Sequence, residues 1–325
     1  MRTVVDSHVH HWDPERLAYP WLDEFTRLRR PYLPEHLAAD AAGLGVAGVV
    51  HVQADCRPDQ ALAEVDLVAA LDAPVPVLGV VAYAGVERGA AVADELAALT
   101  ERPLVRGTRR STQNEPDGVL GSAAYRDGLV EVARAGLTAD LCVRAAQLPE
   151  VVAALRDVLD REPGLRVVLD HAGKPSIADD VTGTGRTRAA WRADLADLAA
   201  LPGVVCKASG LVTEADWDAW TPGPVLPYLA DVLDVFGPGR VLFGSDWPVL
   251  TLAADYPRWL ALVAGAVEPL GDAALDAVLA GNAVRTYRLT VPARPAPPAH
   301  RADPADPAHP AHPAHPARDG AAPRP

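Results

Sequence analysis

Cysteine and long apolar runs are scarce in this chain. Its three cysteines, Cys56, Cys142 and Cys206, are widely spaced and form no CxxC pair, so neither a disulfide framework nor a zinc ribbon is expected. No apolar run approaches the roughly 18 residues of a bilayer-spanning helix. The opening MRTVVD has neither the basic nor the apolar region of a secretory leader. We therefore expect a cytoplasmic protein without a membrane partner.

Positive charge is also in short supply. Thirty basic residues stand against 43 acidic ones, for a net charge of −13, which argues against nucleic acid or an anionic membrane as a partner. A small-molecule substrate fits better, and the oligomeric state stays open, a homo-oligomer included. Only Lys174 and Lys207 are lysines, and every other basic residue is arginine. These two places are candidates for sites that need a compact ammonium group.

Eight short apolar runs rich in β-branched residues alternate with longer segments of helical periodicity. This alternation predicts parallel βα units. No GxGxxG or Walker-type loop follows a strand, so a TIM-type (β/α)8 barrel is favoured over a doubly wound dinucleotide-binding sheet. The expected strands cover 3–8, 48–53, 75–83, 104–109, 138–143, 166–173, 204–209 and 240–246. The expected helices cover 58–72, 89–100, 122–136, 148–162, 191–201, 224–237, 255–267 and 272–287, the last of which should close the barrel.

The composition changes near the end of the chain. Residues 1–290 are expected to form the barrel domain, whereas 291–325 are dominated by proline, alanine and histidine, with a repeated AHP triplet. Such a segment cannot build a core, so we expect a disordered tail without an assigned role.

Ionisable side chains end most of the predicted strands. The carboxyl ends of barrel strands open on one face, so these groups should converge there. His8 and His10 share one side of the first strand, whereas His11 points the other way and is expected to pack locally. His171 follows the sixth strand and Asp246 the eighth. The three imidazoles (His8, His10 and His171) and the carboxylate could hold one divalent metal, or could polarise a carbonyl while Asp246 activates water.

A second group of side chains is expected to contact substrate. They lie near strand ends and can bind hydroxyls, a carboxylate or the face of a sugar ring. The alternatives are rim salt bridges for the cations and core packing for the tryptophans. The candidates are Arg106, Arg109, Arg144, Lys174, Lys207, Gln53, Trp12 and Trp247. Asp6 is a candidate for orienting a histidine, and His51 is expected to be structural.

Six motifs in order carry a resemblance to a known family: DSHVHHWDP, RGTRR, DLCVRAAQLPEV, VVLDHAGKP, VVCKASGLVTEADW and VLFGSDWPV. From about residue 3 to 289 the chain resembles the amidohydrolase-related (type 2) branch of the amidohydrolase superfamily, and within it the sugar lactonases that act on L-fuconolactone or L-rhamnonolactone. The resemblance implies a barrel hydrolase. Its HxH pair maps onto His8 and His10, its later-strand histidine onto His171, and its general base onto Asp246.

The chain departs from the binuclear members of that superfamily. Those members place a carboxylated lysine on strand four and histidines on both strands five and six. Here strand four carries Arg106, Gly107 and Thr108, and only one such histidine is present. The resemblance therefore implies one zinc-like ion, or none.

These observations favour an enzyme that opens a sugar-derived lactone, an aldonolactone, with water activated by Asp246. Two alternatives stay open. One is a metal-dependent decarboxylase of an aromatic carboxylic acid that uses the same four residues. The other is a barrel that binds a sugar acid without catalysis, which the intact set of chemical groups disfavours.

Overall fold

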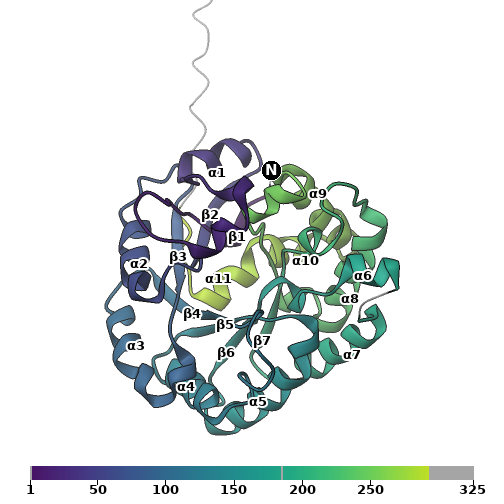
Figure 1. Ribbon diagram of the computed structural model, residues 1–325. Helices are drawn as coiled ribbons and strands as arrows, with labels where there is room; N and C mark the ends of the chain where they lie inside the picture. The colour runs from purple at the N-terminus through teal and green to yellow at the C-terminus, as the bar shows by residue number, and fades with distance from the viewer. Residues whose placement is uncertain (1, 184–185, 293–325) are drawn as a thin grey trace, which may run out of the picture. The chain divides into compact units, whose positions relative to one another are not determined.

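The computed structural model describes residues 2–183 and 186–292 (Figure 1). The chain up to Pro292 forms one compact unit. The predicted tail, 291–325, lies outside the described residues apart from its first two positions. None of the helices within the described ranges has the length and apolar character of a transmembrane span.

Eight parallel strands form a single sheet whose spatial order follows the sequence from β1 to β8. Helices lie between successive strands and surround them, as Figure 1 shows. The predicted (β/α)8 barrel is confirmed, and each predicted strand is present. The strands are β1 (Val4–Val9), β2 (Val46–Val52), β3 (Val77–Ala82), β4 (Val105–Ser111), β5 (Thr138–Cys142), β6 (Arg166–Leu169), β7 (Val204–Ala208) and β8 (Val241–Phe243).

The first and last strands meet just beyond β8. A parallel bridge joins Val9 to Trp247. The amide of Asp246 donates to the carbonyl of His8 at 2.9 Å, and the amide of His10 donates to the carbonyl of Trp247 at 2.8 Å. Closure therefore occurs at the residues that carry the predicted catalytic groups.

Eight helical segments were expected, and the structure has a helix in each of them. Residues 272–287 are not one regular helix, because a π-helical turn, Ala277–Gly281, separates its two halves. α1 and α6 have no counterpart among the expected helices, because seven and six residues are too few to show a helical period. The helices are α1 (Pro34–Asp40), α2 (Ala61–Ala69), α3 (Ala93–Thr100), α4 (Ala123–Arg134), α5 (Leu148–Arg161), α6 (Ile177–Thr182), α7 (Arg188–Ala199), α8 (Pro222–Phe236), α9 (Tyr256–Val267), α10 (Asp272–Asp276) and α11 (Asn282–Tyr287).

α5 illustrates how the helices form. Its apolar residues recur every three or four positions, and Val151, Leu155 and Val158 are buried against the barrel. A proline in its first turn needs no hydrogen-bond partner there. Burial of this stripe holds the helix on the outside of the sheet.

β6 and β8 are shorter than expected. The sixth strand, predicted to reach residue 173, stops at Leu169, and Asp170–Gly173 form a tight 3-10 turn. His171 has a φ of 53° and Asp246 a φ of 62°, both in the left-handed region. That conformation ends a strand and turns the side chain away from the sheet. Both deviations therefore occur at predicted catalytic residues.

The interior of the barrel is filled from one end. Val5, Val50, Val168 and Leu242 form a buried cluster with side chains of the last helix, including Tyr287. Figure 1 shows α11 within the ring of strands. The last helix thus closes one end of the barrel, and the side chains at the carboxyl ends of the strands face the other.

Candidate active site

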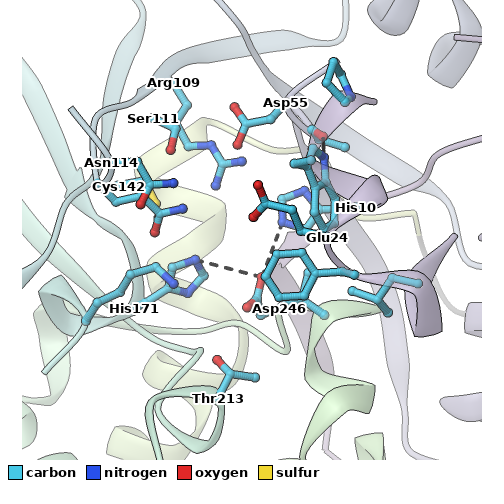
Figure 2. Close-up of a pocket in the computed structure, with 18 of the residues that line it drawn as sticks. His10, Glu24, Asp55, Arg109, Ser111, Asn114, Cys142, His171, Thr213 and Asp246 are labelled. Atoms are coloured by element: carbon cyan, nitrogen blue, oxygen red, sulfur yellow. Dashed lines mark hydrogen bonds and ion pairs between the residues drawn. The ribbon is translucent and has the colours of Figure 1, made fainter. Parts of the chain in front are cut away.

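The structure brings the four predicted catalytic side chains together at the carboxyl ends of β1, β6 and β8. Asp246 lies at their centre. Its Oδ1 is 3.3 Å from His10 Nε2, 3.6 Å from His8 Nε2 and 3.9 Å from His171 Nε2. Figure 2 shows His10 and His171 directed at Asp246 from opposite sides. All four side chains are buried, so their electrostatic interactions are strong.

Asp6 fixes the backbone around this centre. Its carboxylate accepts the amide of His8 at 3.0 Å, the amide of Ser245 at 2.9 Å and the hydroxyl of Tyr256 at 2.8 Å. The predicted role of Asp6 was to orient a histidine, and the structure places it on the backbone of His8. One carboxylate therefore ties the start of the barrel to its end.

Small residues make room for the imidazoles. Gly210 has a φ of 65°, and a Cβ at this position would lie 2.6 Å from Nδ1 of His171. A Cβ at Gly244 would lie 2.8 Å from Cβ of His8. Both contacts are shorter than real Cβ atoms make, so glycine is needed where β7 and β8 pass the histidines.

The charge states follow from burial and from the neighbours. Burial opposes ionisation of Asp246, but His171, His10 and Lys174 together hold the pKa of its carboxyl below the ordinary value. Burial lowers the pKa of His8 and of His171 well below the ordinary range of an imidazole. At neutral pH Asp246 is therefore an ionised carboxylate, and His8 and His171 beside it are neutral.

Each imidazole has a different partner on its far side. His10 Nδ1 lies 2.7 Å from the carbonyl of Val52, which can only accept, so this ring nitrogen donates to it. His171 Nδ1 lies 2.9 Å from the hydroxyl of Ser209. His8 Nδ1 lies 3.1 Å from the ammonium group of Lys207. His11, by contrast, faces away, and its amide donates to the ring of His51 at 3.2 Å.

His8, His10 and Asp246 lie close enough together to hold a zinc-like ion. Tetrahedral zinc at about 2.0–2.1 Å from its ligands separates the ligand atoms by about 3.4 Å, close to the 3.3 Å and 3.6 Å that separate Asp246 Oδ1 from His10 Nε2 and His8 Nε2. A histidine ligand normally donates its second N–H to a carbonyl or carboxylate, and Nδ1 of His10 lies 2.7 Å from the carbonyl of Val52. His171 belongs to a second cluster of possible ligands, with His8 and Asp170. Cations flank His8, because Lys207 Nζ is 3.1 Å from its Nδ1 and an Arg109 Nη is 3.4 Å from its Nε2.

A cavity of about 730 Å³ opens above Asp246, a size typical of small-molecule sites. One wall carries polar side chains from β4 and the residues after it, including Arg109, Ser111 and Asn114 (Figure 2). An aromatic part of the lining includes Trp21, Phe25 and Trp217, and is called the aromatic wall below. Such a cavity suits a ligand with both hydroxyl groups and apolar faces.

Three of the eight predicted substrate-binding residues line this cavity. They are Arg109, Arg144 and Lys174. Arg144 donates to the side chain of Asn114 at 3.0 Å, and Lys174 pairs with Glu214 at 3.0 Å. Arg144 and Lys174 are thereby held in place beside the cavity.

Arg106 and Gln53 lie away from the cavity lining. The guanidinium of Arg106 donates to the carbonyls of Pro103 and Val105, at 2.6 and 2.9 Å. Gln53 donates to the carboxylate of Asp55 at 2.9 Å and accepts the Asp55 amide. Gln53 thereby holds Asp55, which does line the cavity, at a φ of 52°.

Trp12 and Trp247 are fully buried behind the cavity. The indole N–H of Trp12 donates to the carbonyl of Arg30 at 2.9 Å, and that of Trp247 donates to Asp40 at 2.8 Å. Both rings also contact Tyr32 edge-on. They support the loops that form the aromatic wall.

Lys207 also lies away from the lining, inside the barrel. Its Nζ pairs with Asp140 at 2.7 Å and with Asp170 at 2.9 Å, and Tyr287 of α11 donates to Asp140 from below. Sequence reasoning expected Asp170 at the end of the sixth strand, beside His171, but missed Asp140 as part of the site. Opposite charges within the otherwise apolar runs TADLCV and VVCKAS were the available signal.

Comparison with known proteins decides the family. The family model described as "Amidohydrolase" matches residues 5–289. The chain belongs to the amidohydrolase family. Among its relatives in this family, an L-fucono-1,5-lactonase of Burkholderia multivorans is 37% identical over 89% of this chain and 97% of its own length. An L-fucono-1,5-lactonase of Burkholderia ambifaria is 34% identical over the same shares.

A solved amidohydrolase structure shares the fold. The crystal structure of an amidohydrolase from Burkholderia multivorans with bound zinc has a TM-score of 0.77 and 34% identity to this chain. The match covers 89% of this chain and all of the other. The eight-stranded barrel found here is thus the architecture of an experimentally determined amidohydrolase.

Proposed function

We propose that this amidohydrolase opens a sugar-derived lactone, an aldonolactone such as L-fuconolactone, by adding water activated by Asp246. The observation that carries the proposal is the buried, ionised Asp246 with three imidazole nitrogens within 3.9 Å, at the floor of a partly polar cavity. The two relatives named L-fucono-1,5-lactonase support the choice of a lactone.

In this mechanism the Asp246 carboxylate accepts a proton from water while the water oxygen bonds to the lactone carbonyl carbon. The carbonyl π electrons move to its oxygen, which becomes the oxyanion of a tetrahedral intermediate. When the carbonyl re-forms, the bond to the ring oxygen breaks, and Asp246 returns the proton to that leaving oxygen. The products are an open-chain hydroxy acid and the enzyme in its starting state.

His10 assists the water in this scheme. Its Nε2 lies 3.3 Å from Asp246 Oδ1. A water placed beside both atoms would be oriented by hydrogen bonds to them, with an oxygen lone pair toward the substrate. A divalent ion held by His8, His10 and Asp246 would supply Lewis-acid polarisation of the carbonyl when bound.

The rim cations are proposed to bind the substrate. Arg109 carries a permanent charge at the cavity wall, and its buried guanidinium is held by the carbonyl of Gln53 at 2.6 Å. Arg144 and Lys174 are proposed to bind hydroxyl groups at the rim. The carboxylates of Asp55 and Glu24 also line the cavity. Acceptors of this kind bind hydroxyl groups, which a polyhydroxy lactone carries.

A lactone panel tests the proposal. Aldono-1,4- and 1,5-lactones would be monitored by acid release with a pH indicator, with and without added Zn²⁺ or Mn²⁺. We expect hydrolysis of at least one aldonolactone and a loss of at least about 10³-fold in kcat for Asp246→Asn. Asp234→Asn, an exposed acid on α8, is the matched control and should retain activity. Absence of acid release from every lactone, or CO₂ release from aromatic acids, would contradict the proposal, as would full activity of Asp246→Asn.

A further inference from the structure

We infer that Asp55 is a specificity-determining residue, whose carboxylate accepts a hydrogen bond from a hydroxyl group at one fixed position of the substrate. The inference deepens the proposed function and rests on it for the identity of the ligand, a polyhydroxy lactone. Asp55 and Glu24 both lie among the residues around the cavity (Figure 2). The structure holds these two acids very differently, and that difference points to Asp55.

Four acids line the cavity besides the proposed base, Asp246. Two of them are neutralised by neighbouring cations, because Glu115 pairs with Arg110 and Glu214 with Lys174. Asp55 and Glu24 form no ion pair within the part of the chain that the structure describes. These two carboxylates are therefore available as acceptors for a ligand.

The backbone of Asp55 has a conformation that is uncommon outside glycine. Its φ of 52° lies in the left-handed region. Six of the described residues other than glycine have a positive φ, and four of them line the cavity: Asp55, His171, Lys174 and Asp246. Such conformations persist only where the surrounding structure enforces them, and they gather at functional sites.

The surroundings enforce this conformation through the backbone. Five consecutive backbone groups, from the Gln53 amide to the Asp55 amide, are each hydrogen-bonded. In chain order their partners are the carbonyl of Val81, Nη2 of Arg109, Oε1 of Glu64, the indole N–H of Trp21 and Oε1 of Gln53. None of these bonds uses the Asp55 side chain. The loop is thus built to place this side chain, and does not depend on it.

The side chain of Gln53 fixes the Asp55 carboxylate. Gln53 is fully buried, and the Asp55 amide lies 2.6 Å from its side chain. An amide N–H can only donate, so the atom that it faces is Oε1 and the orientation of the Gln53 side chain is determined. Nε2 of Gln53 then donates to Asp55 Oδ1 at 2.9 Å. Asp55 Oδ2 has no hydrogen-bond partner among the described residues, so one oxygen of a fixed carboxylate is left for a ligand.

Glu24 lacks such support. It follows the short 3-10 helix Pro20–Asp23 and is exposed, and in the described ranges its side chain takes part in no hydrogen bond or ion pair. A free side chain can turn toward whichever hydroxyl is near, and it loses rotamer freedom when it binds. Asp55 has already lost that freedom in the folded protein. A hydrogen bond to Asp55 is therefore limited to one position of the substrate.

Lactones that lack single hydroxyl groups test the inference. For the aldonolactone that the wild-type enzyme hydrolyses fastest, kcat/KM would be compared with that of each monodeoxy analogue. A hydrogen bond to a charged group corresponds to about 10–100-fold, so loss of one particular hydroxyl should lower kcat/KM by this factor in the wild type. In Asp55→Gly the same loss should matter less than about threefold, because the acceptor is gone. Equal discrimination by the two enzymes at every hydroxyl would overturn the inference.

Three further variants serve as controls. Asp55→Asn keeps an oxygen for Gln53 Nε2 but replaces the free acceptor by a donor, so it should also lose at least about fivefold of the discrimination. This variant decides the question if Asp55→Gly does not fold. Asp72→Gly, at an exposed acid in the link between α2 and β3, should keep the wild-type discrimination. Glu24→Ala should lower kcat/KM to a similar extent for all analogues, and loss of discrimination in Glu24→Ala alone would overturn the assignment to Asp55.

Binding measurements separate this inference from the proposed function. Aldono-1,5-lactams carry the same hydroxyl groups on a ring that is not readily hydrolysed, and calorimetry would give their Kd for wild type and Asp55→Gly. If the wild type hydrolyses no lactone, the proposed function is overturned, and a lactam bound about 10–100-fold more weakly by Asp55→Gly would still support the role of Asp55. Equal binding by the two proteins, or no binding of any lactam by the wild type, would overturn the inference.

Discussion

Asp246 is the proposed general base of the site. Burial opposes its ionisation, and the neighbouring imidazoles and the Lys174 cation more than offset that effect, so the pKa of its carboxyl is below the ordinary value. At neutral pH the Asp246 carboxyl is therefore already deprotonated and can accept a proton from water. His8 and His171 stay neutral beside it because burial lowers the pKa of each ring.

This charge state predicts the pH dependence of activity. The carboxylate is the active form, and its pKa is depressed, so kcat/KM should stay level from about pH 8 down to about pH 5 and fall only below about pH 4. Lys174→Met removes a cation that lowers this pKa, so the acidic limb should move to higher pH. Rates on a lactone between pH 3 and 8 would measure both effects. The exposed control Arg134→Met should not move the limb, and a wild-type midpoint near pH 7 would contradict the assignment.

Sequence reasoning reached the four central residues because strand ends in a barrel share one face. The spacing of His8 and His10, with His171 and Asp246 at later strand ends, was enough to expect the cluster that the structure brings together. The charged residues of the Lys207 network are visible in the runs TADLCV and VVCKAS, but their pairing could not be predicted. It depends on which side chains of β5, β6 and β7 point inward at one level, and that register is not visible in the individual runs.

At the scale of elements, the strands could be predicted because each is an apolar run between helical segments. The ends of the strands could not be predicted, because the left-handed turns at His171 and Asp246 depend on contacts with distant strands.

A buried side chain holds the link between β2 and α2. Glu64 of α2 is buried, and its carboxyl accepts the amide of Ala54 at 2.9 Å, which holds the loop that carries Asp55 to the cavity.

Glu64 predicts a pH-dependent stability for this link. Burial, only partly offset by the hydrogen bond from Ala54, raises the pKa of Glu64 from 4.5 to about 8. Between these values the folded protein keeps a proton that the unfolded chain releases, so this contribution to the free energy of unfolding falls as pH rises. Glutamine cannot ionise, so Glu64→Gln should not lose free energy of unfolding in this way as pH rises. At pH 8.5 it should be more stable than wild type by about 2–4 kcal/mol, by the 1.4 kcal/mol per pKa unit of linkage.

Denaturant unfolding at two pH values would measure this effect. At pH 4.5 and below, the difference between Glu64→Gln and wild type should largely disappear, because Glu64 is then protonated in both states of the wild-type protein. Glu101→Gln, an exposed acid next to the end of α3, is the control and should show no such pH dependence. A Glu64→Gln variant that is less stable than wild type at both pH values would contradict the prediction.

At the scale of the whole molecule, the described chain up to Pro292 is one compact unit. We propose that this unit, close to the predicted domain 1–290, is sufficient for folding and activity. A chain ended after Pro292 should have the same free energy of unfolding as the full chain and a kcat within about twofold of it. The reason is that the proline-rich composition of the remainder is not that of a hydrophobic core. Thermal unfolding and a lactone assay would test this, and a large loss of either would contradict it.

A shorter chain should behave very differently. Ending it after Gly281 removes Asn282, whose side chain donates to the carbonyls of Pro238 and Val241 at 2.7 and 2.6 Å, and Tyr287, which donates to Asp140. All eight strands would still be present. We expect this chain to lose cooperative unfolding and lactone hydrolysis, and wild-type activity of such a chain would show that α11 is dispensable.

The position of Tyr287 has a consequence for the growing chain on the ribosome. His8 emerges among the first residues, and the last strand is complete at Phe243. The tyrosine that holds the Asp140–Lys207 pair below His8 leaves the ribosome some forty residues after that strand. An unfinished chain thus contains every catalytic side chain while the support beneath its first histidine is still missing. Activity should therefore appear only when synthesis of the barrel is essentially finished.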